Sequence, residues 1–392
     1  MANYKIKLMN RISQEGLKRL PEDKYSVGTD ITEPDGILVR SAHMKGQPLP
    51  ESVLAIARAG AGVNNIPVDE CTERGIPVFY TPGANANAVK EMVIASLYLS
   101  SRNIIEATEW VDTIANSGDE IPQLVESGKG QFVGAEVSGK TLGIIGLGAI
   151  GVLVANAAIH LGITVYGYDP YISVDNAWGL SRSVEHANSI SEIYKNCDYI
   201  TIHIPLTEAT KNTINRDSIA QMKDGVRILN FARGGLVDSE DIAEAVASGK
   251  VACYITDFPD KHLIGKKGII SIPHLGASTP ESEENCAKMA AQELSAYLEH
   301  GSIINAVNFP RCEITESHIG RVTLFNKNIP GMLSAVTTVA SDCGYNIETL
   351  SSAANKGMSV SYTVLDLDKT PDDTFVQKLR ELDGIFRVRV IF

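Results

Sequence analysis

Two short segments carry the side chains best suited to binding an acid and moving a proton. The first is NFARGGLVD (230–238), which contains Arg233, and the second is PHLGAST (273–279), which contains His274. A guanidinium binds a carboxylate through two parallel hydrogen bonds. An imidazole titrates near neutrality and can take a proton from a hydroxyl group. Together they suit hydride transfer from a 2-hydroxy acid. Either residue alone could equally be a surface arginine or a hydrogen-bonded histidine at a strand end.

A glycine-rich turn, GLGAIG (146–151), follows one apolar segment and precedes another. In a strand–turn–helix unit these glycines permit a tight turn, the approach of a pyrophosphate, and close packing of helix on strand. The helix N-terminus supplies free N–H groups for phosphates. The next apolar segment ends in Asp169, whose carboxylate suits an adenosine ribose and repels a 2′-phosphate, so NAD is favoured over NADP. The predicted cofactor contacts are Gly146, Gly148, Ala149, Ile150, Gly151 and Asp169. The alternative is a glycine turn in some other α/β protein.

Alternating strand and helix patterns place these motifs at the ends of predicted strands. We expect strands at 37–42, 76–83, 199–205, 226–232 and 268–276, helices at 51–60, 85–109 and 280–301, and a connection at 116–139. Such alternation is typical of parallel sheets covered by helices. From Ile319 the pattern becomes β-α-β-β-α-β, the ferredoxin-like order. The predicted fold is α/β, with two Rossmann-like lobes of parallel sheets and this smaller C-terminal unit.

Composition excludes several classes of function. The 392 residues are 44% apolar and 21% charged with a net charge of −12, which disfavours disorder and binding to nucleic acid or anionic lipid. The six cysteines form no CxxC pair, so we expect neither a disulfide framework nor a metal site. The segment 141–168 lacks charged residues, but its glycines fit the turn described above better than a membrane span. The first ten residues lack a signal-peptide core. We therefore expect a cytoplasmic protein that binds no membrane.

From about Ile37 to Pro310 the chain resembles the D-isomer-specific 2-hydroxyacid dehydrogenase family. RAGAGVNNIPVDECTERGIPVFYTPGAN (58–85) and PHLGAST are similar to its D-3-phosphoglycerate dehydrogenase branch. The C-terminal unit, with NKNIPGMLSAVTTVASDCGYNI, resembles an ACT domain, a small-molecule sensor that binds L-serine in dehydrogenases of this branch. The resemblance implies NAD-dependent oxidation of D-3-phosphoglycerate to 3-phosphohydroxypyruvate, the first step of L-serine biosynthesis, under control by L-serine.

The resemblance also implies roles for individual residues in two lobes that close over the ligands. Arg233 holds the substrate carboxylate and His274 accepts the hydroxyl proton. The implied nicotinamide contacts are Phe231, Ala232, Asp257 and Gly276. The implied substrate contacts are the backbone N–H groups of Gly62, Val63 and Gly83, with Arg40, Asn85 and Lys90 as candidates for the phosphate. Helix capping or simple solvation is the alternative for these last three side chains.

One position departs from the family pattern. In the family, the glutamate that usually partners the histidine is the E of a segment like DVF-x-x-E-P. Here the aligned residues are DFPDK (257–261), with Lys261 at the place of the glutamate and Asp260 beside it. A carboxylate beside an imidazole favours imidazolium, whereas a lysine cation favours the neutral form that accepts a proton. We expect Lys261 to tune His274 or to relay its proton. The alternative is that Lys261 points to solvent and Asp260 supplies the carboxylate.

The ACT-like unit carries the implied effector site. Asn326, Asn328 and Asn346 match positions that contact serine in regulated relatives, although others have histidine at the place of Asn326. Loop capping is the alternative role for these asparagines. Because such ligands usually lie between ACT units of two subunits, the resemblance also implies a homo-oligomer, either a dimer or a tetramer.

The predicted division places the substrate lobe at 1–90 and 284–315, the NAD-binding domain at 91–283 and the ACT domain at 319–392. Two other functions stay open. One is a dehydrogenase for another D-2-hydroxy acid, such as D-glycerate or 2-hydroxyglutarate. The other is a non-catalytic regulator that senses NAD, which the missing glutamate favours and the presence of Arg233 and His274 disfavours.

Overall fold

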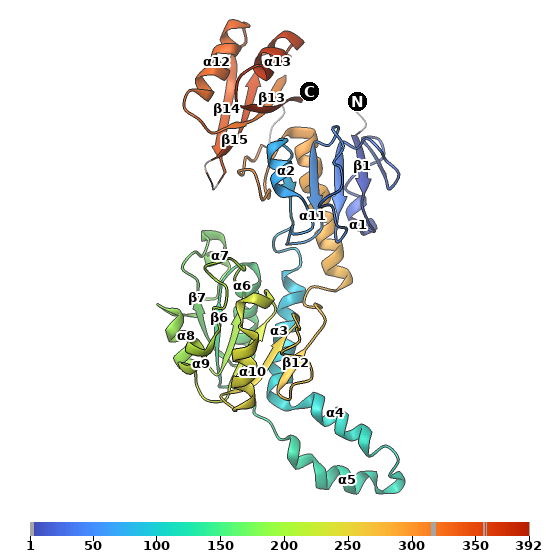
Figure 1. The fold of residues 1–392 in the computed structure, drawn as a ribbon, viewed down its shortest axis with the longest axis vertical. Helices are drawn as coiled ribbons and strands as arrows, with labels where there is room; N and C mark the ends of the chain where they lie inside the picture. The colour runs from blue at the N-terminus through green and yellow to red at the C-terminus, as the bar shows by residue number, and fades with distance from the viewer. Residues whose placement is uncertain (1–3, 315–318, 356, 358, 392) are drawn as a thin grey trace. The chain divides into compact units, whose positions relative to one another are not determined.

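The computed structural model describes residues 4–314, 319–355, 357 and 359–391 and divides into two compact units (Figure 1). Unit 1 contains Met1–Asn85 and Pro280–Phe392, and unit 2 contains Ala86–Thr279. Unit 1 is thus built from both ends of the chain and unit 2 from its middle.

A five-stranded parallel sheet forms the first part of unit 1, in the order β2-β1-β3-β4-β5. Its central strand β3 is buried along its whole length, as expected for a parallel sheet covered on both faces. The strands are β1 (Tyr4–Leu8), β2 (Tyr25–Gly28), β3 (Gly36–Val39), β4 (Ala55–Arg58) and β5 (Val78–Phe79), and the helices are α1 (Gln14–Leu17), α2 (Val68–Glu73) and α11 (Pro280–His300).

Helix α11 is the largest contributor to the core of this part. Its buried side chains include Leu294, Tyr297 and Leu298, which pack in one cluster with apolar residues of β1, β3 and β4. Helix α1 approaches α11 so closely that a Cβ on Gly16 would lie 2.5 Å from the carbonyl carbon of Ala287. Glycine is therefore required at that position, and α11 fixes α1 against the sheet.

The prediction of a helix at 51–60 is wrong, because Ala55–Arg58 is the strand β4 between β3 and β5. Alanine favours helices, but pairing on both sides and complete burial of Ala55, Ile56 and Ala57 outweigh that preference. The strand predicted at 76–83 is also too long, since β5 covers only Val78–Phe79.

A seven-stranded parallel sheet forms unit 2, in the order β12-β11-β10-β9-β6-β7-β8. The chain runs outward from β6 through β7 in one direction and from β9 through β10 in the other. The carboxyl ends of β6 and β9 are therefore the topological switch point, where ligands of such sheets bind. The strands are β6 (Thr141–Ile145), β7 (Thr164–Tyr168), β8 (Glu185–His186), β9 (Tyr199–Ile202), β10 (Val226–Asn230), β11 (Val251–Thr256) and β12 (Ile269–Ser271).

Helices cover both faces of this sheet. α3 (Ala86–Arg102) and α6 (Ala149–His160) supply apolar side chains to the core on one face. α8 (Ile190–Asn196), α9 (Arg216–Ala220) and α10 (Ser239–Ala247) do so on the other, and α7 (Val174–Gly179) follows β7. Across the described ranges no helix combines the length and apolar composition needed to cross a bilayer.

The helix predicted at 85–109 is interrupted. α3 ends at Arg102 and α4 (Ile104–Thr113) begins after Asn103, whose φ of +49° places it in the left-handed region. The predicted connection at 116–139 contains helical turns, namely η1 (Gly118–Glu120), α5 (Ile121–Gly128) and η2 (Lys129–Phe132). Together α4 and α5 extend as an arm from unit 2, and the rings of Trp110 and Phe132 lie 5.5 Å apart within it (Figure 1).

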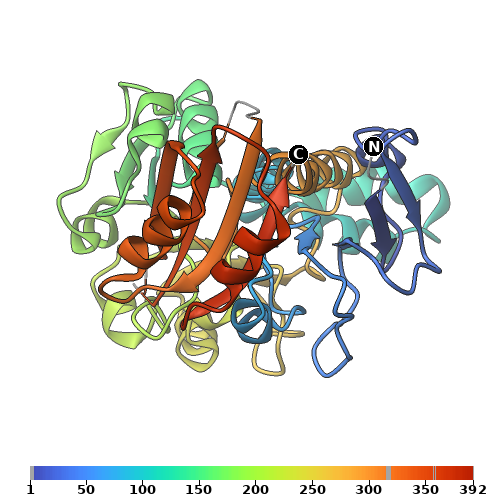
Figure 2. The same cartoon turned by 90° about the horizontal axis from the view of Figure 1, so that it is seen from above.

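The C-terminal part of unit 1 is a four-stranded antiparallel sheet in the order β14-β15-β13-β16. It follows the predicted β-α-β-β-α-β order, and both helices lie on one face of the sheet (Figure 2). The elements are β13 (Gly320–Lys327), α12 (Met332–Asp342), β14 (Ile347–Ala354), β15 (Val360–Leu367), α13 (Asp373–Arg380) and β16 (Ile385–Ile391).

The other face of this sheet packs on the end of α11. Phe325 of β13 lies 4.3 Å from Phe309 and 4.6 Å from Tyr362, measured between ring centroids, and these residues share one buried cluster with Tyr297. Side chains of the sheet also donate to backbone carbonyls at the C-terminus of α11. Arg389 donates to Tyr297 (2.8 Å) and Leu298, Arg321 to His300 (3.1 Å), and Tyr362 to Gly301 (2.6 Å).

These contacts make the C-terminal sheet part of unit 1. The last carbonyls of a helix have no intrahelical partner and carry its negative dipole end, so arginine is well suited to that position. Arg321 is itself paired with Asp366 and only 3% exposed. The predicted fold, with two parallel α/β sheets and a small C-terminal sheet, is confirmed.

Candidate active site

The glycine turn has the geometry of a phosphate cradle. Gly146 has a φ of +98°, and a Cβ on it would lie 2.6 Å from the carbonyl oxygen of His203. A Cβ on Gly151 would lie 2.0 Å from the carbonyl oxygen of Gly146. Gly148, by contrast, faces open space at the N-terminus of α6, where no side chain caps the helix. Two glycines thus pack the turn tightly, and the third leaves room for a pyrophosphate at the positive end of the helix.

Asp169 is tied to this turn. Its carboxylate accepts the backbone N–H of Leu147 and that of Tyr171, both at 2.8 Å. Each carboxylate oxygen retains a further lone pair for a hydroxyl donor. The carboxylate therefore has the position predicted for a ribose acceptor.

The second group of predicted residues lies at the ends of β10, β11 and β12. Asp257 is 2% exposed, its Oδ2 accepts the N–H of Gly276 at 2.9 Å, and its main-chain oxygen accepts the N–H of His274 at 3.0 Å. A Cβ on Gly276 would lie 2.9 Å from Oδ2 of Asp257 and 3.6 Å from the ring of Phe231. The structure therefore brings these four residues together.

Asp257 retains one unused acceptor. Its Oδ1 is buried and has no hydrogen-bond partner among the described residues. Burial raises the pKa of Asp257, while the N–H of Gly276 and the charges of His274 and Arg233 act in the opposite direction. A buried acceptor without a donor fits the amide of a nicotinamide, so these residues fit the cofactor predicted from the glycine turn.

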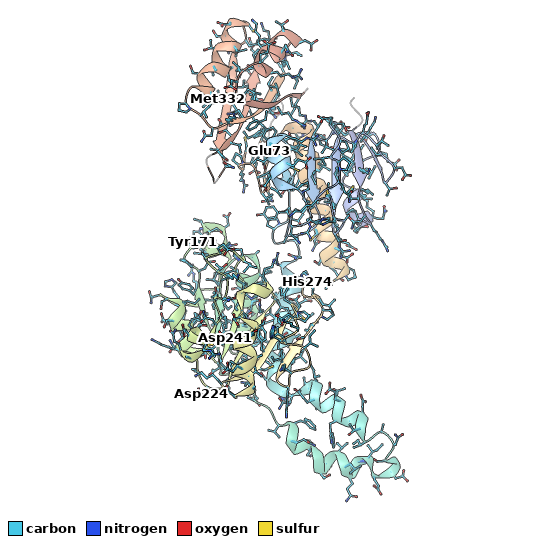
Figure 3. The ribbon with its side chains drawn as sticks, in the orientation of Figure 1. Glu73, Tyr171, Asp224, Asp241, His274 and Met332 are labelled. Atoms are coloured by element: carbon cyan, nitrogen blue, oxygen red, sulfur yellow. The ribbon has the colours of Figure 1, made fainter. Side chains whose placement is uncertain are left out.

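The two chemically active side chains are accessible. Arg233 is exposed and its Nη1 donates to the main-chain oxygen of Ala232 at 2.6 Å. His274 is exposed on the loop between β12 and α11, has a φ of +35°, and its ring lies 4.8 Å from that of Phe258 (Figure 3). Left-handed backbone is uncommon for histidine, and here the bonds of Asp257 hold it.

Neither candidate partner of His274 is bonded to its ring. Lys261 is exposed, and its ammonium forms no hydrogen bond or ion pair within the described part of the chain. The Asp260 carboxylate accepts the hydroxyl of Ser239 and the N–H of His262 (2.8 Å). The Asp260 carboxylate is therefore already bonded to neighbouring residues. Whether Lys261 or Asp260 assists His274 stays a prediction.

The predicted anion-binding residues of unit 1 lie at the ends of β3, β4 and β5. Within the described residues the N–H groups of Gly62, Val63 and Gly83 form no backbone hydrogen bond, and Gly83 has a φ of +79°. Arg40 is half exposed and forms an ion pair with Glu283 at 2.5 Å. Asn85 is partly buried at the end of the same segment.

Sequence reasoning missed Arg58, the last residue of β4. Its Nε donates to the main-chain oxygen of Arg40 at 2.9 Å, so two arginines lie at adjacent strand ends. A Cβ on Gly60 would lie 3.3 Å from the guanidinium of Arg58, so this glycine gives the arginine its room. Parallel pairing of β3 with β4 would indicate this neighbour, but the prediction of a helix at 51–60 excludes that pairing.

The three predicted effector residues differ in exposure. Asn326 is 3% exposed, and its side chain donates to the oxygen of Lys327 at 2.9 Å and accepts from Thr363 at 3.4 Å. Asn328 is exposed just after β13, and Asn346 is exposed just before β14. Only the latter two present their side chains to solvent.

The fold and the site define a dinucleotide-binding α/β protein with an arginine and a histidine beside the nicotinamide position. The pattern of the family described as "D-isomer specific 2-hydroxyacid dehydrogenase, NAD binding domain" matches residues 94–276. The D-3-phosphoglycerate dehydrogenase of Haemophilus influenzae is 31% identical over 353 residues, which are 87% of this chain and 82% of that protein. The chain therefore belongs to the D-isomer-specific 2-hydroxyacid dehydrogenases, and its cofactor is NAD.

Other relatives agree with this assignment. The D-3-phosphoglycerate dehydrogenase of Bacillus subtilis is 31% identical over 325 residues, and the chain spans 59% of that protein's length. A solved structure of NAD+-bound 3-phosphoglycerate dehydrogenase from Entamoeba histolytica has a TM-score of 0.61 at 26% identity, covering 78% of this chain and 99% of that one.

Proposed function

We propose that the chain oxidises D-3-phosphoglycerate to 3-phosphohydroxypyruvate, the first step of L-serine biosynthesis. The observation that carries this substrate is the pair Arg40 and Arg58 at adjacent strand ends in unit 1. D-glycerate has one anionic group, whereas D-3-phosphoglycerate has a phosphate in addition to its carboxylate. Two guanidiniums suit a phosphate, and the free N–H groups near Gly62 and Gly83 suit a second anion. The names of the relatives support the same substrate.

In this proposal unit 2 supplies the chemistry. Arg233 binds the substrate carboxylate and polarises the C2 oxygen, and His274 accepts the hydroxyl proton. The O–H and C2–H bonds break as the C2=O bond forms. The proton goes to the imidazole, and the hydride is accepted by the oxidised nicotinamide when NAD is bound. Asp257 would hold the carboxamide through its unused Oδ1.

The test is NADH formation at alkaline pH with D-3-phosphoglycerate, with the ketone product trapped because the equilibrium opposes oxidation. D-glycerate and 2-hydroxyglutarate serve as competing substrates. If Arg58 binds phosphate, Arg58→Met should lower kcat/KM for D-3-phosphoglycerate about ten- to a hundredfold and leave that for D-glycerate nearly unchanged. The matched control is Arg19→Met, at an exposed arginine. A higher kcat/KM for another acid would reject D-3-phosphoglycerate as the substrate. Binding of NAD without any turnover would favour a non-catalytic regulator.

Lys261 is proposed to tune His274 or relay its proton. It is exposed and carries no partner among the described residues, so its ammonium is available. Comparing the pH dependence of kcat/KM in wild type and Lys261→Ala tests this role. Identical profiles would remove Lys261 from the mechanism, and Asp260→Asn would then test the other candidate.

We also propose that L-serine inhibits the enzyme through an ACT-type C-terminal domain and that the chain is a cytoplasmic homo-oligomer, a dimer or tetramer. The β-α-β-β-α-β order supports the domain, and six free cysteines suit a reducing compartment. The division into 1–90 with 284–315, 91–283 and 319–392 belongs to this proposal. Inhibition by L-serine that Asn346→Ala weakens would support it, whereas turnover insensitive to L-serine would reject the effector.

A further inference from the structure

Asn230, the last residue of β10, lies at the base of the loop that carries Arg233. It is fully buried, whereas Arg233 is exposed. A buried amide costs free energy unless its donors and acceptor find partners. All of its hydrogen-bonding groups are used here, and their partners lie in the Arg233 loop and on the next strand.

The Asn230 side chain holds both ends of a two-residue segment. Its Oδ1 accepts the N–H of Ala232 at 3.1 Å, and its Nδ2 donates to the main-chain oxygen of Arg233 at 2.8 Å. The peptide groups before Ala232 and after Arg233 are therefore fixed by one rigid amide. Arg233 itself has extended backbone, with φ −155° and ψ 146°, at the start of the turn η3 (Gly234–Leu236).

The second N–H of the amide reaches β11. Nδ2 also donates to the hydroxyl of Tyr254 at 3.4 Å, and Tyr254 is 1% exposed. Asn230 is in register with Thr256, whose hydroxyl accepts the N–H of Phe258 at 3.1 Å. The ring of Phe258 in turn lies against His274. The loops of the arginine and the histidine are thus anchored to paired positions on adjacent strands.

We propose that Asn230 is a positioning residue that fixes the backbone of Arg233, so that the guanidinium is aligned with the substrate carboxylate. The hydrogen bond to the Tyr254 hydroxyl holds the Asn230 amide in place. The inference rests on the proposed role of Arg233. An arginine side chain has several rotatable bonds, so its aim depends on a fixed Cα. A displacement of about 1 Å at a substrate-binding group costs about a hundredfold in rate. An aspartate at 230 would keep the shape and the acceptor but lose both donated bonds.

The test compares Asn230→Asp with Asn308→Asp in the full chain. Asn308 is a matched control, because it is 6% exposed, also forms three hydrogen bonds and lies in unit 1 outside the proposed machinery. Asn230→Asp should lower kcat/KM for D-3-phosphoglycerate about a hundredfold. It should also weaken oxalate binding to the NADH complex about tenfold or more, while NADH affinity stays within about twofold. Asn308→Asp should leave all three quantities within about twofold. Equal effects of the two variants would overturn the proposal.

A double-mutant cycle separates positioning from general destabilisation. In an Arg233→Lys background, adding Asn230→Asp should change oxalate affinity by less than about twofold, because its effect passes through Arg233. Additive losses would overturn the proposal. If Asn230→Asp does not fold, Tyr254→Phe removes one supporting bond and keeps the buried ring, and it should weaken oxalate binding in the same direction. Unchanged oxalate affinity in Tyr254→Phe would then refute the support role.

Oxalate binding needs no turnover, so this experiment is independent of the substrate. Wild type that binds oxalate with NADH but does not oxidise D-3-phosphoglycerate would refute the proposed substrate and leave the positioning of Arg233 testable by oxalate affinity.

Discussion

Replacing Arg389 with methionine should loosen the C-terminal sheet from the end of α11. The guanidinium donates to the oxygens of Tyr297 (2.8 Å) and Leu298, and it lies over the rings of Tyr4 and Tyr297 at 6.0 and 5.2 Å from their centroids. Methionine keeps much of the apolar stem and removes the charge and all of these polar contacts. The perturbation is therefore confined to the end of α11 and to Tyr4 at the start of β1.

The size of the expected loss of stability depends on which hydrogen bonds remain in the variant. Hydrogen bonds from a charged donor contribute about 1.5–3 kcal/mol, and a cation at a helix C-terminus contributes about 0.3–1 kcal/mol. Both carbonyls keep another donor, since Gly301 N–H bonds the Tyr297 oxygen at 2.9 Å and the Tyr4 hydroxyl bonds that of Leu298 at 2.8 Å. The Tyr4 hydroxyl loses the bond that it accepts from Arg389 at 3.3 Å but keeps the one that it donates. Neither carbonyl is left without a donor, so we expect a loss of about 2 kcal/mol, near the lower end of the range.

Hydrogen exchange measures this loss of stability segment by segment. A local measurement is needed because a chain of several parts does not unfold in a single two-state transition. Amides of β13 and β16 should exchange about thirtyfold faster in Arg389→Met, while peptides of unit 2 stay unchanged. Arg380→Met, at an exposed arginine in the last turn of α13, is the control and should change exchange less than about twofold. Equal protection of β13 and β16 in the two variants would refute the reasoning.

Two further predictions concern the cofactor region of unit 2. Gly148→Ala should fold normally but bind NAD about tenfold more weakly, because its methyl group enters the open space at the helix end. Gly151→Ala should lose about 3 kcal/mol of stability, because its Cβ clashes with the main-chain oxygen of Gly146. NADH titration measures the first effect and urea unfolding the second, and normal NAD affinity in Gly148→Ala would show that the pyrophosphate does not bind beside Gly148. Because burial raises the pKa of Asp257, ionisation of this group costs the folded state stability as pH rises from the ordinary carboxyl range through the raised value. Asp257→Asn should therefore gain in thermal midpoint relative to wild type between about pH 4 and pH 7, and a constant difference across that range would contradict the burial argument.

The features that could be predicted from the sequence are those determined by one short segment of the chain. The glycine turn joins a strand and a helix that are adjacent in the chain, so its geometry follows from local rules. The helix at 280–301 is long and periodic, and α11 confirms it almost to the residue. The prediction at 51–60 was wrong for the opposite reason. The alanine-containing segment of β4 is extended only because it pairs with its neighbours β3 and β5.

Residues whose role depends on a neighbour in space were missed or misplaced. Asn230 lies within the segment NFARGGLVD, but its partner Tyr254 belongs to the next strand. Asn326 was expected to face an effector, yet β13 is buried on both faces from Gly320 to Asn326. The strand alternates polar and apolar residues from Arg321 to Leu324, a pattern typical of a half-buried strand, so the sequence does not show that its polar face is buried as well. Docking on α11, which causes that burial, has no local signature.

The contact between the C-terminal sheet and α11 provides a route by which the proposed effector, L-serine, would control the enzyme. Arg321, Tyr362 and Arg389 attach β13, β15 and β16 to the carbonyls that end α11. The same helix packs through Leu294 on β3, where a Cβ on Gly36 would lie 3.1 Å from its side chain, and β3 leads directly to Arg40. A ligand that shifts β13 by a fraction of an ångström therefore acts on α11 and, through close packing, on the strand that carries the proposed phosphate site. Inhibition by this route should raise KM for the substrate before it lowers kcat, and Arg389→Met should weaken the inhibition without removing any residue that contacts the effector.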